Sequence, residues 1–249
     1  MRASAKAIPY ALGALLLGVL GLASGDFAFQ WQPVPDTVPL RPGLAYLSAA
    51  AMAVSALAAV TPWRAREGRL LLALFFGVWA VLLHGLRVAV RPGSVIEWLG
   101  LAESTAMAAG GVALFADTLE AGSWRRRLTF WTRIAFGFCL LVFGLSHFVY
   151  LSFTADMTPA WLPWRTGWAA ATGAGHAAAG LAFLSRRFLS AAGAAVTGMM
   201  ASFVVLLHIP RVVAEPASRM EWTMTSVALT LTGAALALWR LNAEAPRDQ

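Results

Sequence analysis

A histidine followed three residues later by an arginine occurs twice in this chain, each time within an apolar stretch. The two copies are LLHGLRVAVRP at 82–92, with His84 and Arg87, and LLHIPRVVAEP at 206–216, with His208 and Arg211. On a helix this spacing places the imidazole and the guanidinium on one face. Histidine can bind a metal, carry a proton or donate a hydrogen bond. Arginine can hold a carboxylate, a phosphate or a quinone head group in a bidentate grip. The two stretches are therefore the first candidates for a ligand site.

Three further ionisable side chains, His147, His176 and Glu103, lie within or at the ends of apolar stretches. Such groups are costly inside a bilayer and count as functional hypotheses by default. The alternative for each histidine is a bond to a neighbouring helix or a backbone carbonyl. His147, His176 and His208 could face one cavity in the outer leaflet, and Glu103 could relay a proton or bind a histidine.

The two arginines have alternatives of their own. Arg87 and Arg211 could reach lipid phosphates, or pair with Glu97 and Glu221, instead of holding a ligand. Structural pairing is the favoured interpretation, and a pocket for a lipid-soluble ligand with a polar head stays open beside it.

Familiar enzyme motifs are missing from the sequence, so catalytic residues stay unknown. There is no GxSxG, Walker or GxGxxG motif. The single cysteine, Cys139, excludes an intramolecular disulfide and a CxxC motif. Axial haem ligation by His84 and His208, or zinc or copper at the second-half histidines, lacks any supporting ligand spacing. We therefore predict no metal site and disfavour haem.

Composition indicates an integral membrane protein. The 249 residues are 59% apolar and 12% charged, and their mean hydropathy is +0.68. The net charge of +7 comes from cations scattered singly between apolar runs, which make no continuous patch for nucleic acid.

Eight apolar stretches have roughly the 20 residues that a helix needs to cross a bilayer. They cover 8–25, 43–61, 69–91, 95–116, 130–152, 166–185, 188–213 and 221–240. Since backbone groups in lipid must be paired within the segment, we predict an all-α protein of eight transmembrane helices. The first stretch, with Arg2, Lys6 and Ala23-Ser24-Gly25, also resembles a cleavable signal peptide, which would remove about residues 1–25.

The positive-inside rule predicts that both termini face the cytoplasm. With the N-terminus inside, 13 of the 19 basic residues fall on the inner side. They are Arg2, Lys6, Arg64, Arg66, Arg69, Arg125, Arg126, Arg127, Arg133, Arg186, Arg187, Arg240 and Arg247. The six outer cations face six outer acids: Asp26, Asp36, Glu97, Asp156, Glu215 and Glu221.

An offset of 124 residues aligns the two halves of the chain. It matches His84, Arg87, Pro92, Glu97 and Trp98 with His208, Arg211, Pro216, Glu221 and Trp222. We therefore predict a first four-helix unit at 1–116, a basic cytoplasmic linker at 117–129 and a second unit at 130–249. Because four crossings are an even number, the two bundles are parallel, related by a pseudo-twofold axis along the membrane normal.

The halves differ at the other histidines. At the positions of His147 and His176 the first half has Ala23 and Met52. The sequence therefore favours the second half as the active one. In each half a segment rich in proline and aromatic residues, at 25–43 and 150–167, is expected as an interfacial loop or short half-helix, which either forms part of an aromatic belt or covers an outer pocket.

Residues 143–184 resemble the DoxX-like family of bacterial membrane proteins. Gly144, His147 and Phe148 match the end of that family's first helix. Gly173, His176 and Gly180 match its second motif, although the family has glutamate where this chain has His176. The first half resembles the same unit more weakly, as a tandem copy.

This resemblance implies a multi-pass protein of the bacterial cytoplasmic (inner) membrane, associated with thiosulfate:quinone oxidoreductase or other redox complexes. We expect a membrane subunit or scaffold without catalysis of its own, in contact with lipid and with a membrane or periplasmic redox partner. One alternative is a quinone-binding oxidoreductase subunit, with His147, His176, His208 and Arg211 at the ligand. The other is a carrier of small solutes.

Overall fold

The chain folds into helices throughout the range that the structure, a computed structural model, describes, residues 5–243. The predicted inner cations Arg2 and Arg247 lie outside the described residues. Short 3-10 turns cover Ala5–Ala7 and Phe29–Trp31. The α-helices are α1 (Ile8–Ser24), α2 (Arg41–Val60), α3 (Ala65–Val78), α4 (Leu86–Val90), α5 (Val95–Ala116), α6 (Ser123–Val149), α7 (Leu151–Met157), α8 (Arg165–Ser185), α9 (Leu189–Phe203), α10 (Ile209–Ala214) and α11 (Arg219–Ala243).

Two of the long helices contain a π-helical turn. Trp79–Gly85 joins α3 to α4, and Val204–His208 joins α9 to α10, so each pair forms one continuous helix of 26 residues. A π turn adds a residue to the helical repeat and redirects the side chains beyond it. His84 and His208 each lie within one of these turns.

Seven helices in the described part of the chain are long and apolar enough to cross a membrane. They correspond to seven of the eight predicted stretches, which makes this a multi-pass membrane protein by length and composition. The remaining stretch forms α8, a helix of 21 residues rich in alanine and glycine. It is not among the seven, so the predicted count of eight is not confirmed.

Two helices begin earlier than predicted. α3 begins at Ala65 and α6 at Ser123, inside the stretch assigned to a linker at 117–129. The charged residues at these starts are compatible with a helix because they project into the polar region beyond the apolar span. Arg127, for example, lies over the indole of Trp124 at 5.7 Å. The connection between α5 and α6 is correspondingly shorter.

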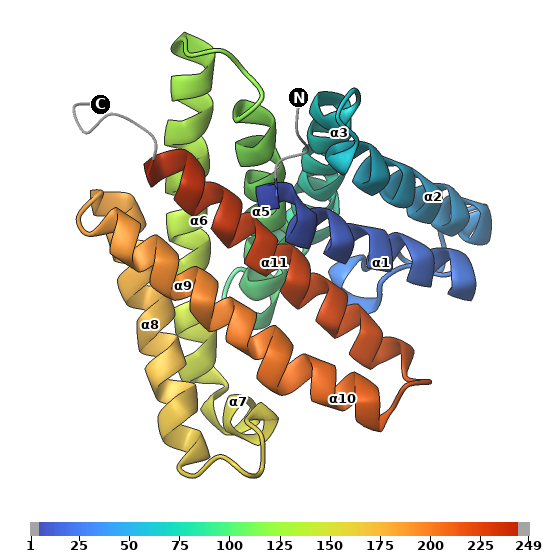
Figure 1. Cartoon of the computed structure of the whole chain (residues 1–249). Coiled ribbons are helices and arrows are strands. Elements are labelled where there is room, and N and C mark those ends of the chain that lie inside the picture. Colours follow the sequence, from blue (N-terminus) through green and yellow to red (C-terminus); the bar gives the residue numbers. More distant parts are fainter. Residues whose placement is uncertain (1–4, 244–249) are drawn as a thin grey trace.

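Most helices pack against the helices next to them in the chain. The two halves contact each other through α1 with α11 and through α5 with α6. Figure 1 shows α1 alongside α11 and α5 alongside α6. The first long helix of each half thus packs on the last helix of the other. α5 and α11, which also contact each other, are the most buried of the seven apolar helices.

Small residues allow α1 to approach α11 closely. A Cβ atom on Gly13 would lie 2.6 Å from the backbone oxygen of Ser226. Nearby, the buried Tyr10 hydroxyl donates a hydrogen bond of 2.7 Å to the carbonyl of Met107 in α5. Lipid provides little hydrophobic force between helices, so close packing and such polar contacts hold them together.

Two buried arginines bind the ends of neighbouring helices. Arg69 of α3 donates to the carbonyls of Ala59 and Leu114, each at 3.2 Å. Arg133 of α6 donates to the carbonyls of Phe183 and Leu184, the latter at 3.1 Å. The last carbonyls of a helix lack intrahelical donors and carry its negative partial charge, so a guanidinium there satisfies both needs.

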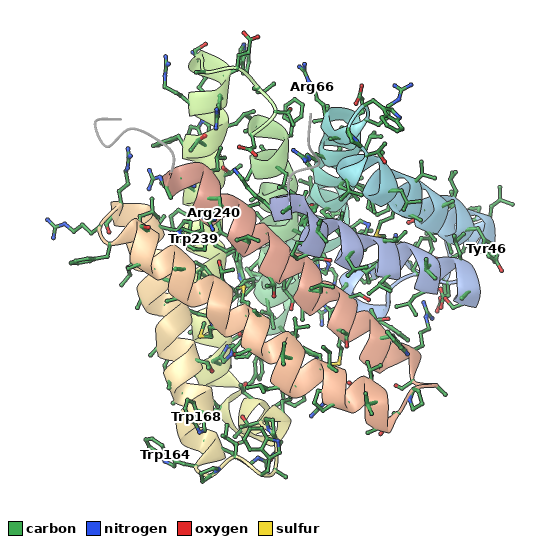
Figure 2. The ribbon with its side chains drawn as sticks, viewed as in Figure 1. Tyr46, Arg66, Trp164, Trp168, Trp239 and Arg240 are labelled. Atoms are coloured by element: carbon green, nitrogen blue, oxygen red, sulfur yellow. The ribbon has the colours of Figure 1, made fainter. Side chains whose placement is uncertain are left out.

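Aromatic and basic side chains lie near the ends of the long helices. In Figure 2, Arg66, Trp239 and Arg240 lie toward one side of the molecule, and Trp164 and Trp168 lie at the opposite end. Tryptophan and arginine at helix ends are typical of membrane interfaces. We call the side with the turns at 25–40, 91–94, 150–164 and 215–218 the predicted outer end.

Candidate functional site

His147 of α6 and His176 of α8 form a pair of neighbouring imidazoles. Their ring centroids are 4.9 Å apart and the rings are tilted by 45°. His176 is buried, and it also contacts Phe143 at 5.8 Å and Phe203 at 6.1 Å between ring centroids. The two imidazoles therefore lie together in apolar surroundings.

Both rings are held by carbonyls of their own helices. The Nδ1 atom of His147 bonds the carbonyl of Phe143 at 2.8 Å, and that of His176 bonds the carbonyl of Thr172 at 3.0 Å. A carbonyl can only accept, so Nδ1 carries the proton in both residues. When the imidazoles are neutral, each Nε2 atom is then a hydrogen-bond acceptor with a free lone pair.

Glycines bring these two helices close enough for the rings to meet. A Cβ atom on Gly144 would lie 2.9 Å from the carbonyl oxygen of Gly173. A Cβ atom on Gly173 would lie 2.8 Å from the Cβ atom of His147. These glycines allow the close approach of α6 and α8 that pairs the histidines.

A hollow at the protein surface follows His147 directly along the chain. It is formed by Phe148–Phe153 at the junction of α6 and α7, is open to the outside and has a volume of about 490 Å³. Its walls are mainly aromatic and aliphatic, and the hydroxyl-bearing Tyr150 and Ser152 add polar atoms.

His84, in the first half, has a bonding partner instead of an imidazole neighbour. Its Nε2 atom donates to the carbonyl of Trp31 at 3.0 Å, and its side chain is almost completely buried. A Cβ atom at Gly100 would lie 2.5 Å from its Nδ1 atom, so only glycine at that position admits the ring. The sequence offset places Met224 opposite Gly100.

The arginine of the first stretch is tightly paired. Arg87 binds Glu97 through two hydrogen bonds, from Nε to Oε2 at 2.6 Å and from Nη2 to Oε1 at 3.1 Å. Arg91 forms a second ion pair with the same carboxylate. Glu97 is 3% exposed, so its charge is both buried and compensated. Of the predicted alternatives for Arg87, the ion pair is the one present.

The corresponding groups of the second stretch are only loosely bound. Arg211 lies 3.8 Å from Glu221, beyond hydrogen-bonding distance. The Oε2 atom of Glu221 is buried without a hydrogen-bond partner, and so is the Nδ1 atom of His208. Native structures bond nearly all buried polar atoms, so two unsatisfied atoms in one cluster mark an unusual place.

The predicted cluster of three histidines is only partly formed. Within residues 5–243, no hydrogen bond or ring contact joins His208 to His147 or His176. Glu103 lies near the indole of Trp31 without forming an aligned hydrogen bond, and the described contacts show no histidine bonded to it. The described contacts therefore pair His147 with His176 and join neither His208 nor Glu103 to them.

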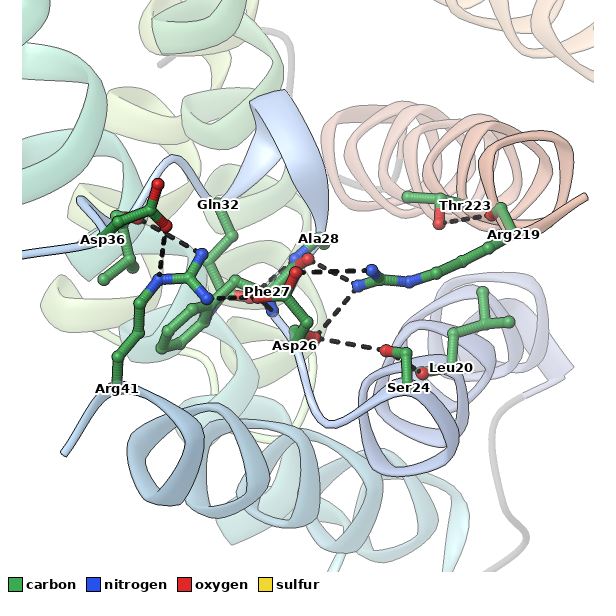
Figure 3. A network of polar contacts seen from close by, with 11 residues as sticks. Leu20, Ser24, Asp26, Phe27, Ala28, Gln32, Asp36, Arg41, Arg219 and Thr223 are labelled. Atoms are coloured by element: carbon green, nitrogen blue, oxygen red, sulfur yellow. Dashed lines mark hydrogen bonds and ion pairs between the residues drawn. The ribbon is translucent and has the colours of Figure 1, made fainter.

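A polar network at the predicted outer end was not predicted from the sequence (Figure 3). Arg219 of α11 donates to the carbonyls of Asp26 and Phe27 at 3.0 and 2.6 Å, and Arg41 binds the Asp26 carboxylate at 2.6 Å. Arg219 also lies over the ring of Phe29 at 4.4 Å. The equal numbers of predicted outer cations and acids were the only signal, and they could not identify which charges meet.

Asp26 remains ionised at the centre of this network. Burial raises the pKa of its carboxyl, but the hydrogen bonds from Phe27 and Arg41 and the charges of Arg41 and Arg219 outweigh burial and lower the pKa. An adjoining cavity of about 10 Å³, lined in part by Asp26, Gln32, Arg219 and Thr223, is about the size of one water molecule. The network ties α11 to the segment between α1 and α2.

Comparison of the chain with family models, curated proteins and solved structures finds no match. The class of protein follows from the fold, which is that of an all-helical, multi-pass membrane protein. Among the predicted site residues, His147 and His176 are the ones that meet with acceptor atoms free.

Proposed function

We propose that the protein is a ligand-binding membrane protein made of two parallel four-helix units, with eight crossings and both termini in the cytoplasm. The exchanged packing of α1 on α11 and of α6 on α5 supports this arrangement, because a twofold axis would relate the two contacts. The distribution of arginines supports the orientation. α8 supplies the eighth crossing, packed against α6 and α9.

The ligand is a lipid-soluble molecule with a hydroxylated ring as its head, the chemistry of a quinol. The observation that carries this proposal is the pair of Nε2 acceptors at His147 and His176. A neutral imidazole that already donates through Nδ1 can accept a hydrogen bond from an O–H group but cannot donate one to a quinone carbonyl. The pair therefore prefers the reduced, hydroxylated form.

The surroundings support entry from the bilayer. The hollow at Phe148–Phe153 is open and largely apolar, and it adjoins His147 in the chain. The exposed rings of Phe148 and Phe153 would contact the isoprenoid or alkyl part of such a ligand. A few polar groups within apolar walls are the usual composition of a small-molecule site.

This role fits the DoxX-like resemblance and a redox-linked membrane subunit of the bacterial inner membrane. The histidine pair provides binding and orientation for the hydroxyl groups. We assign no catalytic step to the chain, since electron transfer would require a partner. A binding subunit without catalysis of its own is thus the function that the geometry supports best.

Thermal unfolding of the purified protein with a soluble quinol analogue tests the proposal. Tetramethylhydroquinone should raise the midpoint saturably, whereas its dimethyl ether, which lacks both O–H groups, should not. His176→Phe keeps an aromatic ring but removes the acceptor, so it should abolish the shift. An equal response to both compounds, or a response retained in His176→Phe, would contradict the proposal.

A further inference from the structure

The two His–Arg stretches end in the same backbone conformation but in opposite charge. Arg91 has φ −130° and ψ 65°, and Glu215 has φ −130° and ψ 68°. The turn beyond each is closed by an indole N–H bonded to a proline carbonyl, at 2.8 Å from Trp98 and 2.9 Å from Trp222. The side chains of Arg91 and Glu215 therefore start from backbone positions with the same local conformation in the two halves.

The first stretch shows which groups provide bonding partners for the histidine and the glutamate. A backbone carbonyl, that of Trp31, accepts from His84, and a second guanidinium, that of Arg91, joins Arg87 at the buried carboxylate of Glu97. One acceptor oxygen and one additional cation satisfy the cluster.

The second stretch lacks both groups. His208 is 8% exposed and its Nδ1 atom has no partner, and the Oε2 atom of Glu221 has none either. Glu215 stands where a second arginine would be needed, so Arg211, Glu215 and Glu221 carry a net charge of −1, whereas Arg87, Arg91 and Glu97 carry +1. Arg211 is 35% exposed and Glu215 is exposed, so these two side chains of the cluster can be reached from the predicted outer end, whereas the unpaired atoms of His208 and Glu221 are buried.

We propose that the cluster of His208, Arg211, Glu215 and Glu221 binds a basic polypeptide segment of a partner protein at the predicted outer end. A backbone carbonyl of that segment accepts a hydrogen bond from the Nδ1 atom of His208, as the Trp31 carbonyl accepts one from the Nε2 atom of His84. Its arginine or lysine takes the place of Arg91 and donates to the unpaired oxygen of Glu221. A hydrogen bond to a buried charged group is worth more than a neutral one, so Glu221 is the principal anchor.

The proposal is independent of the ligand at His147 and His176, because it concerns different residues and a different binding partner. A carbonyl together with a cation is the chemistry of a polypeptide. A phosphatidylethanolamine head group, with its ammonium and ester carbonyls, shares part of that chemistry and serves as the competing outcome.

The test is binding of N-acetyl-arginine methylamide to the full-length protein in phosphatidylcholine nanodiscs, followed by calorimetry or NMR. The citrulline analogue, which has the same shape without the charge, is the ligand control. We expect arginine-selective binding that weakens about tenfold or more in Glu221→Gln, the loss expected for one charged hydrogen bond. Arg87 and Glu97 already have partners, so Glu97→Gln should leave the binding unchanged.

Glu215→Arg provides a second variant that does not depend on losing a contact. This substitution places a guanidinium at the position equivalent to that of Arg91. The new arginine should pair with Glu221, raise the midpoint of thermal unfolding and abolish binding of the probe. Equal binding of the citrulline analogue, or full binding in both Glu221→Gln and Glu215→Arg, would overturn the proposal. So would a midpoint that rises with phosphatidylethanolamine in the nanodisc and not with the arginine probe.

Discussion

The stretches at 82–92 and 206–216 share a histidine, an arginine and a proline in matching backbone conformations. Only in the first do the histidine and the glutamate that faces the arginine both have bonding partners. His84 has the Trp31 carbonyl, and Glu97 has Arg87 and Arg91. His208 and Glu221 each keep a buried atom without a bond. Two copies of one pattern thus differ in how completely their buried polar atoms are bonded.

The difference arises from residues outside the shared pattern. Gly100 leaves room for the His84 ring, whereas the aligned position holds Met224. Arg91 completes the first cluster, whereas Glu215 reverses the charge of the second. Proteins satisfy most buried polar atoms, and exceptions cluster at functional sites. The comparison therefore directs the search for function to the second half.

The largest change in the free energy of unfolding should come from Arg87→Ala, and it should exceed the change caused by Arg211→Ala. Arg87→Ala leaves the buried Glu97 with half of its compensation, so it should lower the free energy of unfolding by about 3 kcal/mol. Arg211→Ala removes a looser, partly exposed pair and should cost less than about 1 kcal/mol. Unfolding in mixed micelles measures both. Equal losses would remove the contrast between the two stretches.

A smaller effect is expected at the glycine that admits His84. Gly100→Ala forces a Cβ atom against the ring, so it should destabilise the protein by about 1–3 kcal/mol, the usual cost of overpacking. Gly198→Ala is the matched control, because a Cβ atom there meets no neighbour within 4 Å. The same micelle unfolding experiment applies. A harmless Gly100→Ala would show that the ring is not confined.

Loss of the bond between the halves at the predicted outer end should cost less again. Arg219→Gln removes the donors to the carbonyls of Asp26 and Phe27, and we expect a loss of about 1–2 kcal/mol. Hydrogen exchange of residues 26–31 should increase in this variant. Unchanged exchange there would mean that the segment is held without Arg219.

The weakest effect concerns pH. The pKa of Asp26 is lowered in the folded protein, so its contribution is complete above the ordinary aspartate pKa of about 3.9 and is lost as pH falls through the lowered value. Stability should therefore decline below about pH 4 more steeply in wild type than in Asp26→Asn. Asp26 is 41% exposed, so the difference should be small. Parallel pH profiles would contradict this role.

Much of the fold could be predicted from the sequence because hydropathy and length determine which segments cross a bilayer. The π-helical turns at Trp79–Gly85 and Val204–His208 could not, since an apolar repeat of 3.6 residues contains no sign of such a turn. The start of α6 at Ser123 was missed because its arginines resemble a linker.

The site was predicted in part. His147 and His176 were predicted, together with His208, to face one cavity, and Glu97 and Glu221 were among the partners considered for Arg87 and Arg211. No described hydrogen bond or ring contact joins His208 to that pair, and its position within a π-helical turn could not be read from the sequence. The bond from Arg219 to residues 26 and 27 joins segments far apart in the chain, which no local pattern could identify.

The most direct test of the central claim, that the second half binds the lipid-soluble ligand, is the quinone and quinol content of the purified protein. Solvent extracts of wild type, His147→Ala, His176→Ala and His84→Ala would be compared after membrane purification, with circular dichroism confirming that each variant is folded. We predict stoichiometric quinol, counted together with any quinone formed from it by oxidation during extraction, in wild type and in His84→Ala, and its loss in His147→Ala and His176→Ala. Absence from the wild type, or equal content in all four proteins, would contradict the account.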